Sequence, residues 1–440
     1  MSSKPRVIVI GAGPVGLYTA HALAKANIDY VVLEQQKDVA FHKGAGIVLF
    51  PASVRLVDQL GLYDRVEKLS THLNSKINTL QDGTVIVRFK LFEPIEEKFG
   101  YPSFGFSRRE MIQVLYDTLP ERETRIRTNA RLVDIETHDK GVRVRLSDGT
   151  VEEGSLVIGA DGVHSRTREI MGRLIRESTD DVDGGKAYPM IANFKAIFGR
   201  TPVPEHLKSQ TGLFAETHGT GVTSQAVIGK EFIYYCIIRT LPKPTTGRRR
   251  FTDQELEEEA RRYFDLNLFP KTRYEDLWAA TTPGEASLVH LEEGFVDQWY
   301  HNRVVLMGDA IHKMTPMNGM GVNIGMQDAT VLVNQLQSLS SSSPDWSADA
   351  LEKALHNYQS TQETIGRQIT DQGAMMTRMV SWSTWFGWFF DRFVTPWLDL
   401  TSMALKGFGP LMANSHILEY IPFEGKAGLV PWKNHPKVQA

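Results

Sequence analysis

Three segments that combine glycines with a carboxylate carry the clearest chemical signal in the sequence. The first, Gly11-Ala12-Gly13-Pro14-Val15-Gly16, follows the apolar run Val7–Ile10. Gly11 permits a tight turn, Gly13 lets a pyrophosphate approach the backbone, and Gly16 lets a helix pack closely on a sheet. Free N–H groups at the start of that helix would place partial positive charge on the phosphates. This spacing predicts a dinucleotide-binding turn.

An acidic residue follows this turn where an adenosine site needs one. Glu34 comes directly after a second apolar run, Tyr30–Leu33, and a helix is expected over Pro14–Ala26 between the two runs. A carboxylate at this place can accept hydrogen bonds from both ribose hydroxyls and would repel a 2′-phosphate. FAD or NAD therefore fits the predicted βαβ unit better than NADP.

The second segment is Asp161-Gly162-Val163-His164-Ser165-Arg166-Thr167-Arg168, which follows the expected strand Ser155–Ile158. One interpretation makes Asp161 a cofactor contact. The other is an ordinary turn with a helix N-cap, because Asp and Ser both cap helices. Taken alone, this segment favours the N-cap.

The third segment, Gly308-Asp309-Ala310-Ile311-His312, follows the apolar run Val304–Met307. A carboxylate such as Asp309 at a strand end can hold a polyol hydroxyl. A helix expected from Gly321 to about Leu339 would direct backbone N–H groups at an anion, such as the N1–C2=O edge of a reduced flavin. The alternative is a turn followed by a surface helix. For His312, a structural hydrogen bond is favoured over acid–base work.

The surrounding pattern predicts an α/β fold with a Rossmann-like FAD-binding domain and an inserted, largely antiparallel β-sheet domain. Residues 1–178 and 301–345 are expected to form the FAD-binding domain, because Rossmann-like strands and glycine turns occur in both. Short alternating runs across 179–300 predict the inserted substrate domain. Helices are expected over 346–440, and Ser338–Ser347 is interpreted as a low-complexity loop.

In their order and residue types, the three segments resemble the GxGxxG, DGxxSxxR and GDAxHxxxP motifs of the aromatic-hydroxylase-like (group A) FAD monooxygenases. The resemblance covers about residues 5–340. It implies FAD as the cofactor and NADPH or NADH as a transient reductant. The reduced flavin of that family reacts with O2 to form a C4a-hydroperoxide, which transfers one oxygen atom to the substrate.

The resemblance also implies cofactor contacts by position. Glu34 would contact the adenosine ribose, Asp309 the ribityl or pyrophosphate arm, and Val322-Asn323 the flavin pyrimidine. Arg108 would contact the cofactor, and Gly44–Val48 would line the flavin through its backbone. The usual GQG turn of the family is Gly319-Met320-Gly321 here, which keeps the helix-end amides. The full expected cofactor-binding set is Gly11, Gly13, Gly16, Glu34, Gly46, Val48, Arg108, Asp161, Asp309, Pro316, Gly321, Val322 and Asn323.

A narrower resemblance points to a substrate class. Gly44–Pro51, Asp58–Asp64, Pro422–Lys426 and Val430–Lys433 are similar to segments of fungal monooxygenases of meroterpenoid and indole-diterpene pathways. That resemblance implies epoxidation of a prenyl-chain alkene in a hydrophobic secondary metabolite. Aromatic ring hydroxylation is the alternative within the family. A flavin- or NAD-binding module without oxygenase turnover is the alternative from another class.

No side chain stands out as a catalytic acid, base or nucleophile, and no metal site is expected. Tyr234 and Tyr235 are the weak catalytic candidates, since strand neighbours face opposite sides and one phenol could lie over the substrate. A packed aromatic strand is the commoner explanation. Cys236 is expected to be a buried strand residue in the same run.

The C-terminal region is rich in aromatic residues, namely Trp382, Trp385, Phe386, Trp388, Phe389, Phe390, Phe393 and Trp397. Three interpretations stay open: the rings roof an apolar substrate pocket, they lie in a membrane interface, or they pack in a core. Either of the first two implies a lipophilic substrate.

Overall composition argues against several other classes of protein. The formal net charge of −3 gives no long-range attraction to nucleic acid. The single cysteine excludes an internal disulfide and fits a reducing compartment. No secretory signal precedes Val7–Ile10, and the longest charge-free apolar stretches near the C-terminus fall short of the ~20 residues that span a bilayer. A cytoplasmic location is therefore expected, with peripheral membrane contact through the aromatic region as an open possibility.

Overall fold

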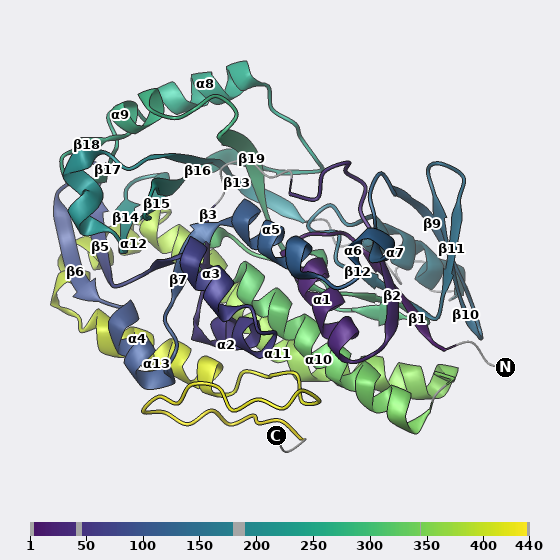
Figure 1. Ribbon diagram of the computed structural model, residues 1–440. Coiled ribbons are helices and arrows are strands. Elements are labelled where there is room, and N and C mark those ends of the chain that lie inside the picture. The colour runs from purple at the N-terminus through teal and green to yellow at the C-terminus, as the bar shows by residue number, and fades with distance from the viewer. Residues whose placement is uncertain (1–3, 41–45, 179–189, 344, 438–440) are drawn as a thin grey trace.

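The computed structural model describes residues 4–40, 46–178, 190–343 and 345–437. A six-stranded sheet and an eight-stranded sheet form its centre, with helices between and around them (Figure 1). The fold is α/β with a large, mainly antiparallel second sheet, as the sequence predicted.

The six-stranded sheet carries the predicted βαβ unit. Its strands lie in the order β20 (Tyr300–His301), β21 (Val304–Leu306), β12 (Leu156–Gly159), β1 (Arg6–Ile10), β2 (Asp29–Leu33) and β8 (Ile126–Arg127). All neighbours are parallel except β20 and β21. Helix α1 (Pro14–Lys25) joins β1 to β2, and α7 (Arg166–Ser178) follows β12. The carboxyl ends of the five parallel strands, from β21 to β8, therefore lie at one edge.

The eight-stranded sheet collects strands from distant parts of the chain. Its order is β22 (His312–Lys313), β19 (Ala286–Phe295), β13 (Ile191–Pro202), β16 (Phe232–Thr246), β15 (Val222–Ile228), β14 (Leu213–His218), β5 (Ser75–Leu80) and β6 (Val85–Lys90). Only the β14–β5 pair is parallel. Strands β5 and β6 come from the first 178 residues and yet pair with strands of the expected substrate domain. The domain limits drawn from the sequence stay a prediction.

The two faces of the large sheet bury different residues. On β16, Tyr235 and its neighbours at every second position pack in a cluster with α8 (Asp253–Arg261) and α9 (Tyr274–Ala279). The opposite face packs against Met317, which follows the third motif, and against Val380 of the C-terminal region. This second face is therefore the one turned toward the third motif.

Smaller sheets and helices complete the molecule. The three-stranded sheets are β11 (Val151–Gly154), β10 (Gly141–Leu146), β9 (Leu132–His138) and β3 (Gly46–Leu49), β7 (Phe104–Ser107), β4 (Thr71–His72); β17 (Asn267–Phe269) pairs with β18 (Thr272–Arg273). The remaining helices of the N-terminal half are α2 (Pro51–Gln59), α3 (Tyr63–Leu69), α4 (Phe92–Phe99), α5 (Arg108–Thr118) and α6 (Arg122–Arg125). The 3₁₀ turns are η1 (Glu205–Gln210), η2 (Gly308–Ala310), η3 (Pro316–Asn318) and η4 (Thr395–Trp397).

The C-terminal region is helical, as expected. It contains α11 (Ala348–Val380), α12 (Trp385–Phe393) and α13 (Leu400–Ala413), and α11 packs along α10 (Gly321–Ser342). The interpretation of Ser338–Ser347 as a loop is wrong in its first half, because α10 continues to Ser342. The hydroxyls of Ser340, Ser341 and Ser342 donate to carbonyl oxygens four residues earlier, so serine is accommodated in the last helical turns. Among the described helices, none has the length and apolar character needed to cross a bilayer.

Candidate flavin and substrate site

The turn between β1 and α1 has the shape that its glycines predict. Gly11 has a φ of +103°, and a Cβ there would lie 2.7 Å from the carbonyl oxygen of Ala160. A Cβ on Gly16 would lie 2.0 Å from the Gly11 carbonyl oxygen. Both positions therefore exclude side chains. The backbone amides of Gly13, Val15 and Gly16 have no acceptor within the described residues, so they are free to meet an anion.

Glu34 is fixed at the end of β2, across this turn. Its Oε2 accepts a hydrogen bond from the Ala12 amide at 2.9 Å, and its Oε1 accepts one from the Gln36 amide at 2.8 Å. The two bonds orient the carboxylate at the carboxyl edge of the sheet. Each oxygen keeps lone pairs that can accept from ribose hydroxyls.

Arg108, the first residue of α5, reaches the same turn. Its Nη2 lies 4.0 Å from the position of a Cβ on Gly13, and its Nε is buried without a hydrogen-bond partner in the described part of the chain. Burial lowers the pKa of Arg108, while the nearby Asp309 carboxylate opposes that effect. A buried cation with an unsatisfied donor calls for an anionic partner. A pyrophosphate fits this requirement.

The start of α5 is held in place by a capping box. The Ser107 side chain accepts a hydrogen bond from the Arg109 amide at 3.2 Å, and Glu110 Oε2 accepts one from the Ser107 amide at 3.0 Å. Such a box satisfies free donors at the first turn of a helix. It therefore fixes the backbone from which Arg108 projects.

Asp309 lies in η2, directly beyond β21. Its Oδ2 accepts a hydrogen bond from Lys313 Nζ at 2.8 Å, and its Oδ1 lies 4.0 Å from the position of a Cβ on Gly321. Burial raises the pKa of Asp309, but Lys313 and Arg108 outweigh it, so the pKa falls below its usual value. The carboxylate is ionised at neutral pH, with one oxygen directed to the start of α10.

His312 has the structural role that was favoured from the sequence. Its Nε2 and Asp328 Oδ2 lie 2.7 Å apart, and both side chains are fully buried. The same Asp328 oxygen accepts a hydrogen bond from the Gly308 amide at 2.9 Å. Asp328 therefore ties the turn before Asp309 to α10, and the structural interpretation of His312 is confirmed.

A side chain of the second motif forms a hydrogen bond with the backbone of the third. Asp161 accepts hydrogen bonds from the Ser165 hydroxyl, the Thr167 amide and the Thr167 hydroxyl, at 2.5, 3.0 and 3.0 Å. It thus fixes the turn before α7, as the N-cap interpretation expects. Arg168 donates to the carbonyl oxygen of Ala310 at 2.9 Å. The Asp161 carboxylate therefore stabilises its own turn, and the contact with η2 comes from Arg168, which is not among the residues predicted to bind the cofactor.

The turn formed by η3 and Gly319 leads into the start of α10. Gly319 has a φ of +65°. Asn323 Nδ2 donates to the carbonyl oxygens of Gly319 and Val48 at 2.8 and 2.9 Å, and its Oδ1 accepts from the Phe50 amide at 3.0 Å. The Asn323 side chain therefore connects α10 to β3 rather than projecting freely.

Backbone amides remain available at the α10 terminus. Those of Gly321, Val322 and Asn323 have no acceptor among the described residues. Three free N–H groups at a helix start favour a negative charge in front of it. Pro316 begins the preceding turn η3, and the expected flavin-lining residues Gly44 and Ala45 lie outside the described residues.

Glu34 and Asp309 follow strands of the same sheet. Glu34 follows β2 and Asp309 follows β21, with β1 and β12 between those strands. Three strand spacings separate them, which corresponds to roughly 14 Å. Arg108 lies between the glycine turn and Asp309. Glu34 and Asp309 therefore lie at one edge of one sheet, over a span that an extended dinucleotide can bridge.

The two tyrosines point to opposite faces of the large sheet. Tyr235 packs on the far face, with its ring 5.4 Å from that of Tyr274 and its hydroxyl 3.3 Å from the Thr281 hydroxyl. Tyr234 lies on the face turned to the cofactor motifs, where its Cβ is 2.7 Å from the position of a Cβ on Gly46. Only Tyr234 is therefore placed near the expected flavin-lining strand.

A buried polar network on that face was not foreseen. His218 Nε2 lies 2.9 Å from Glu216 Oε1, and His218 Nδ1 lies 2.7 Å from Asp391 Oδ2 of α12. Lys76 Nζ lies 3.0 Å from Glu216 Oε2, and Gln225 Nε2 donates to the same oxygen at 3.0 Å. The only sequence signal is the polar residues at alternate positions of β14.

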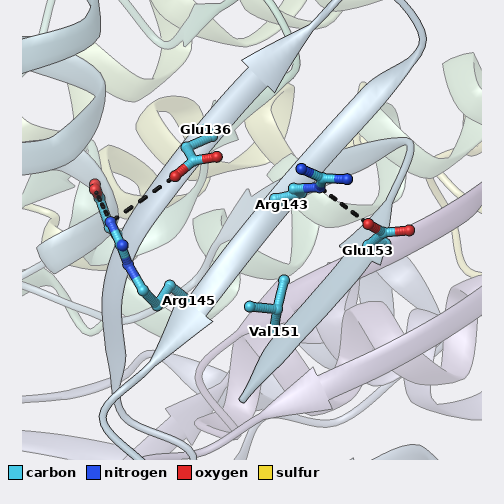
Figure 2. Close-up of a pocket in the computed structure, with 6 residues that line it drawn as sticks. Glu136, Arg143, Arg145, Val151 and Glu153 are labelled. Atoms are coloured by element: carbon cyan, nitrogen blue, oxygen red, sulfur yellow. Dashed lines mark hydrogen bonds and ion pairs between the residues drawn. The ribbon is translucent and has the colours of Figure 1, made fainter. Parts of the chain in front are cut away.

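Other hollows on the surface lie away from these residues. Figure 2 shows one on the face of the three-stranded sheet, where Arg143 pairs with Glu153 and Arg145 approaches Glu136. Another lies between residues 137–139, 297–303 and 348–363. Neither contains a residue of the expected cofactor set. Among the described residues, no group of three or more His, Cys, Asp or Glu side chains is arranged to hold a metal ion.

The chain is similar to known proteins over most of its length. Residues 4–372 match the family model of the FAD binding domain. FAD-dependent monooxygenase srdH of Neurospora crassa is 38% identical, over 97% of this chain and 98% of that protein. FAD-dependent monooxygenase ausM of Penicillium brasilianum is 32% identical, over 97% of this chain and 89% of that protein.

Solved structures share the fold. Klebsiella pneumoniae HpxO complexed with FAD and uric acid matches with a TM-score of 0.76 and 22% identity, over 94% of this chain and 97% of that one. The 2,6-dihydroxypyridine-3-hydroxylase of Arthrobacter nicotinovorans matches with a TM-score of 0.69 and 19% identity, over 87% and 94% of the chains. FAD is therefore the cofactor, and the chain belongs to the family of FAD-dependent monooxygenases that carry this FAD binding domain.

Proposed function

We propose that the protein uses FAD and a nicotinamide reductant, NADPH or NADH, to epoxidise a prenyl-chain alkene of a hydrophobic fungal secondary metabolite. The observation that carries this proposal is the apolar face of the large sheet turned toward the start of α10. Its buried cluster contains Phe194, Ala196, Cys236, Ile238, Leu291, Met317 and Val380, with Phe198 and Val289 half-buried beside it. Such a surface binds a hydrocarbon chain by excluding water from it.

The apolar lining also suits the chemistry. When bound and reduced, FAD supplies the activation of O2 and an electrophilic oxygen. An alkene needs no proton removed before it accepts that oxygen, so a face without a free base is sufficient. Burial raises the pKa of Cys236 far above its usual value, so this thiol stays protonated and does not act as a nucleophile. The lining residues thus position the substrate and exclude water.

The polar residues of the site would hold the cofactor. We assign Glu34 to the adenosine ribose, the free amides after Gly13 together with Arg108 to the pyrophosphate, and Asp309 to the ribityl arm. The amides of Val322 and Asn323 would face the pyrimidine edge of the flavin, where the helix start favours negative charge. These assignments rest on the positions and unsatisfied donors described above.

Product analysis after turnover with ¹⁸O2 tests the reaction. Epoxidation predicts one labelled oxygen bonded to two former alkene carbons, or the diol that hydrolysis gives from it. Labelled oxygen found only on a phenolic carbon would replace the epoxidase proposal with aromatic hydroxylation. A protein that keeps FAD and oxidises the nicotinamide without labelling any organic product would contradict both.

The exposed aromatic residues support a second part of the proposal, contact with a lipid surface from a cytoplasmic location. Trp385, Phe386, Phe389 and Phe393 of α12 are 72%, 60%, 41% and 51% exposed, and Trp397 of η4 is 87% exposed. Core packing is therefore the wrong interpretation for these five rings. Aromatic side chains in this number on one short segment suit the interface of a bilayer, from which a lipophilic substrate would come.

Co-sedimentation with phosphatidylcholine vesicles tests this contact. The wild-type protein should sediment with vesicles, and a variant with Trp385→Ser and Trp397→Ser should stay in the supernatant while it keeps its FAD. Tyr300→Ser, a partly exposed aromatic position elsewhere on the surface, is the matched control. Wild-type protein that does not sediment at any lipid concentration would refute the membrane contact and leave the oxygenase proposal intact.

A further inference from the structure

The side chain of Gln225 carries one hydrogen-bonding atom that the protein leaves free. Its Nε2 donates to Glu216 Oε2 at 3.0 Å and to the carbonyl oxygen of Met317 at 2.9 Å. Its Oε1 has no hydrogen-bond partner within the described residues and is not sealed from solvent. Gln225 is half-buried although it lies in β15, an interior strand of the large sheet.

The orientation of this amide is fixed by its two partners. A carbonyl oxygen can only accept a hydrogen bond, and an ionised carboxylate also only accepts. Burial raises the pKa of Glu216, but Lys76 and His218 outweigh it, so the pKa falls far below its usual value and the group stays ionised. A flipped Gln225 would direct Oε1 at two acceptors. Both hydrogens of Nε2 are therefore used, and Oε1 is the atom that remains.

Gln225 lies where a substrate of the proposed reaction would lie. Its neighbours across the ladder are Cys236 on β16 and Glu216 on β14. Cys236 belongs to the apolar cluster of this face, and Met317 belongs to η3, the turn that leads into α10. Gln225 Oε1 is thus an acceptor beside an apolar surface and close to η3, the turn before α10.

We propose that Gln225 Oε1 accepts a hydrogen bond from the substrate and so determines specificity. The site would take a lipophilic molecule that carries a hydroxyl or N–H donor, in preference to the matching ether or N-alkyl compound. An acceptor from which the bound ligand excludes water discriminates in this way, because a ligand without the donor leaves the oxygen unpaired. This inference rests on the proposed function, since it names a feature of that substrate.

The experiment measures binding to the FAD-loaded protein with two probes, 2-farnesylphenol and its methyl ether. Dissociation constants are read from the perturbation of the flavin absorption spectrum. Wild-type protein should bind the phenol about 3- to 10-fold more tightly, which is the effect of one net hydrogen bond. Gln225→Met should bring the ratio close to one. Gln254→Met, on the surface helix α8, is the matched control and should keep the wild-type ratio.

Two results would overturn the inference: equal affinities of the wild-type protein for both probes, or an undiminished preference in Gln225→Met. Equal affinities of the wild-type protein would overturn the inference even if Gln225→Met loses FAD. A failure of the proposed reaction would be distinguishable from a failure of this inference. Binding with the expected preference but without oxygen transfer would contradict the epoxidation and leave the role of Gln225 standing.

Discussion

Arg168 donates a hydrogen bond to the carbonyl oxygen of Ala310 at 2.9 Å, across 142 positions of the sequence. A second bond, from Arg168 Nη2 to the Val163 carbonyl oxygen at 2.7 Å, keeps the guanidinium in place. The residue before Ala310 is Asp309, the carboxylate assigned to the ribityl arm. An arginine of the second motif thus holds the backbone of the third.

This contact predicts that Arg168 affects FAD retention without touching FAD. Arg168→Met removes both bonds and leaves the Ala310 carbonyl without its donor, so the η2 turn loses support. We expect about tenfold weaker FAD binding, the effect of one or two lost charge-assisted hydrogen bonds. Equilibrium dialysis against FAD measures it. Arg166→Met is the control, since Arg166 is exposed and pairs with Glu169, and an equal loss in both variants would contradict the argument.

The charge of Asp309 should be required for FAD retention. Asp309→Asn keeps the shape of the side chain but removes the charge that faces Arg108 and Lys313, and it offers a donor where an acceptor is needed. We expect the purified variant to lose most of its yellow colour, measured as flavin absorbance per protein. Asp265→Asn, a fully exposed carboxylate, serves as the control. Wild-type flavin content in Asp309→Asn would show that the assignment of this residue is wrong.

The raised pKa of His218 predicts that the protein loses stability at alkaline pH. Burial lowers its pKa, but the bonds to Asp391 and Glu216 outweigh this and raise it from 6.5 to about 9. The groups that face it are Glu216 on its own strand and Asp391 on α12, with Lys76 on β5 beside Glu216. Because the folded pKa lies above the unfolded one, the stabilisation is complete below pH 6.5 and disappears as the pH rises through about 9.

The measurement is the unfolding temperature between pH 6 and pH 10. In the wild-type protein it should fall across the upper half of this range, because neutral His218 leaves two buried carboxylates opposite Lys76 alone. His218→Gln should be less stable than the wild type at pH 6, and its unfolding temperature should change less with pH. His435→Gln, near the C-terminus, is the control. Parallel curves for wild type and His218→Gln would mean that another group controls the alkaline transition.

The turns and helix starts of the three motifs could be predicted from the sequence because the signals for them are local. The β1–α1 turn needs Gly11 and Gly16 for steric reasons, and Glu34 lies one helix and one strand further on. The start of α10 follows from Gly319 and the apolar stripe after it. Such short-range rules can be applied without knowing which strands pair.

The parts that the sequence did not reveal depend on distant pairing. Strands β5 and β6 join the large sheet through the parallel pairing of β5 with β14, which no local pattern specifies. His218 and Asp391 are 173 positions apart and are neighbours only because α12 packs beside β14. The role of Gln225 depends on both Glu216 and Met317, so it appears only once the strands are in register.

Tyr234 and Tyr235 give a final prediction, because adjacent residues of one strand should have separable effects. Tyr235→Phe removes the hydroxyl beside Thr281 on the far face, so it should cost about 0.5–1.5 kcal/mol of unfolding free energy and leave turnover unchanged. Tyr234 lies against Gly46, and its phenol interacts with Arg200 and Glu110. Tyr234→Phe should therefore change the fraction of reduced nicotinamide that yields product instead of hydrogen peroxide. Denaturant unfolding and peroxide release, measured on both variants, separate the two effects. If Tyr235→Phe changed peroxide release as much as Tyr234→Phe, the assignment of the two faces to core and site would be wrong.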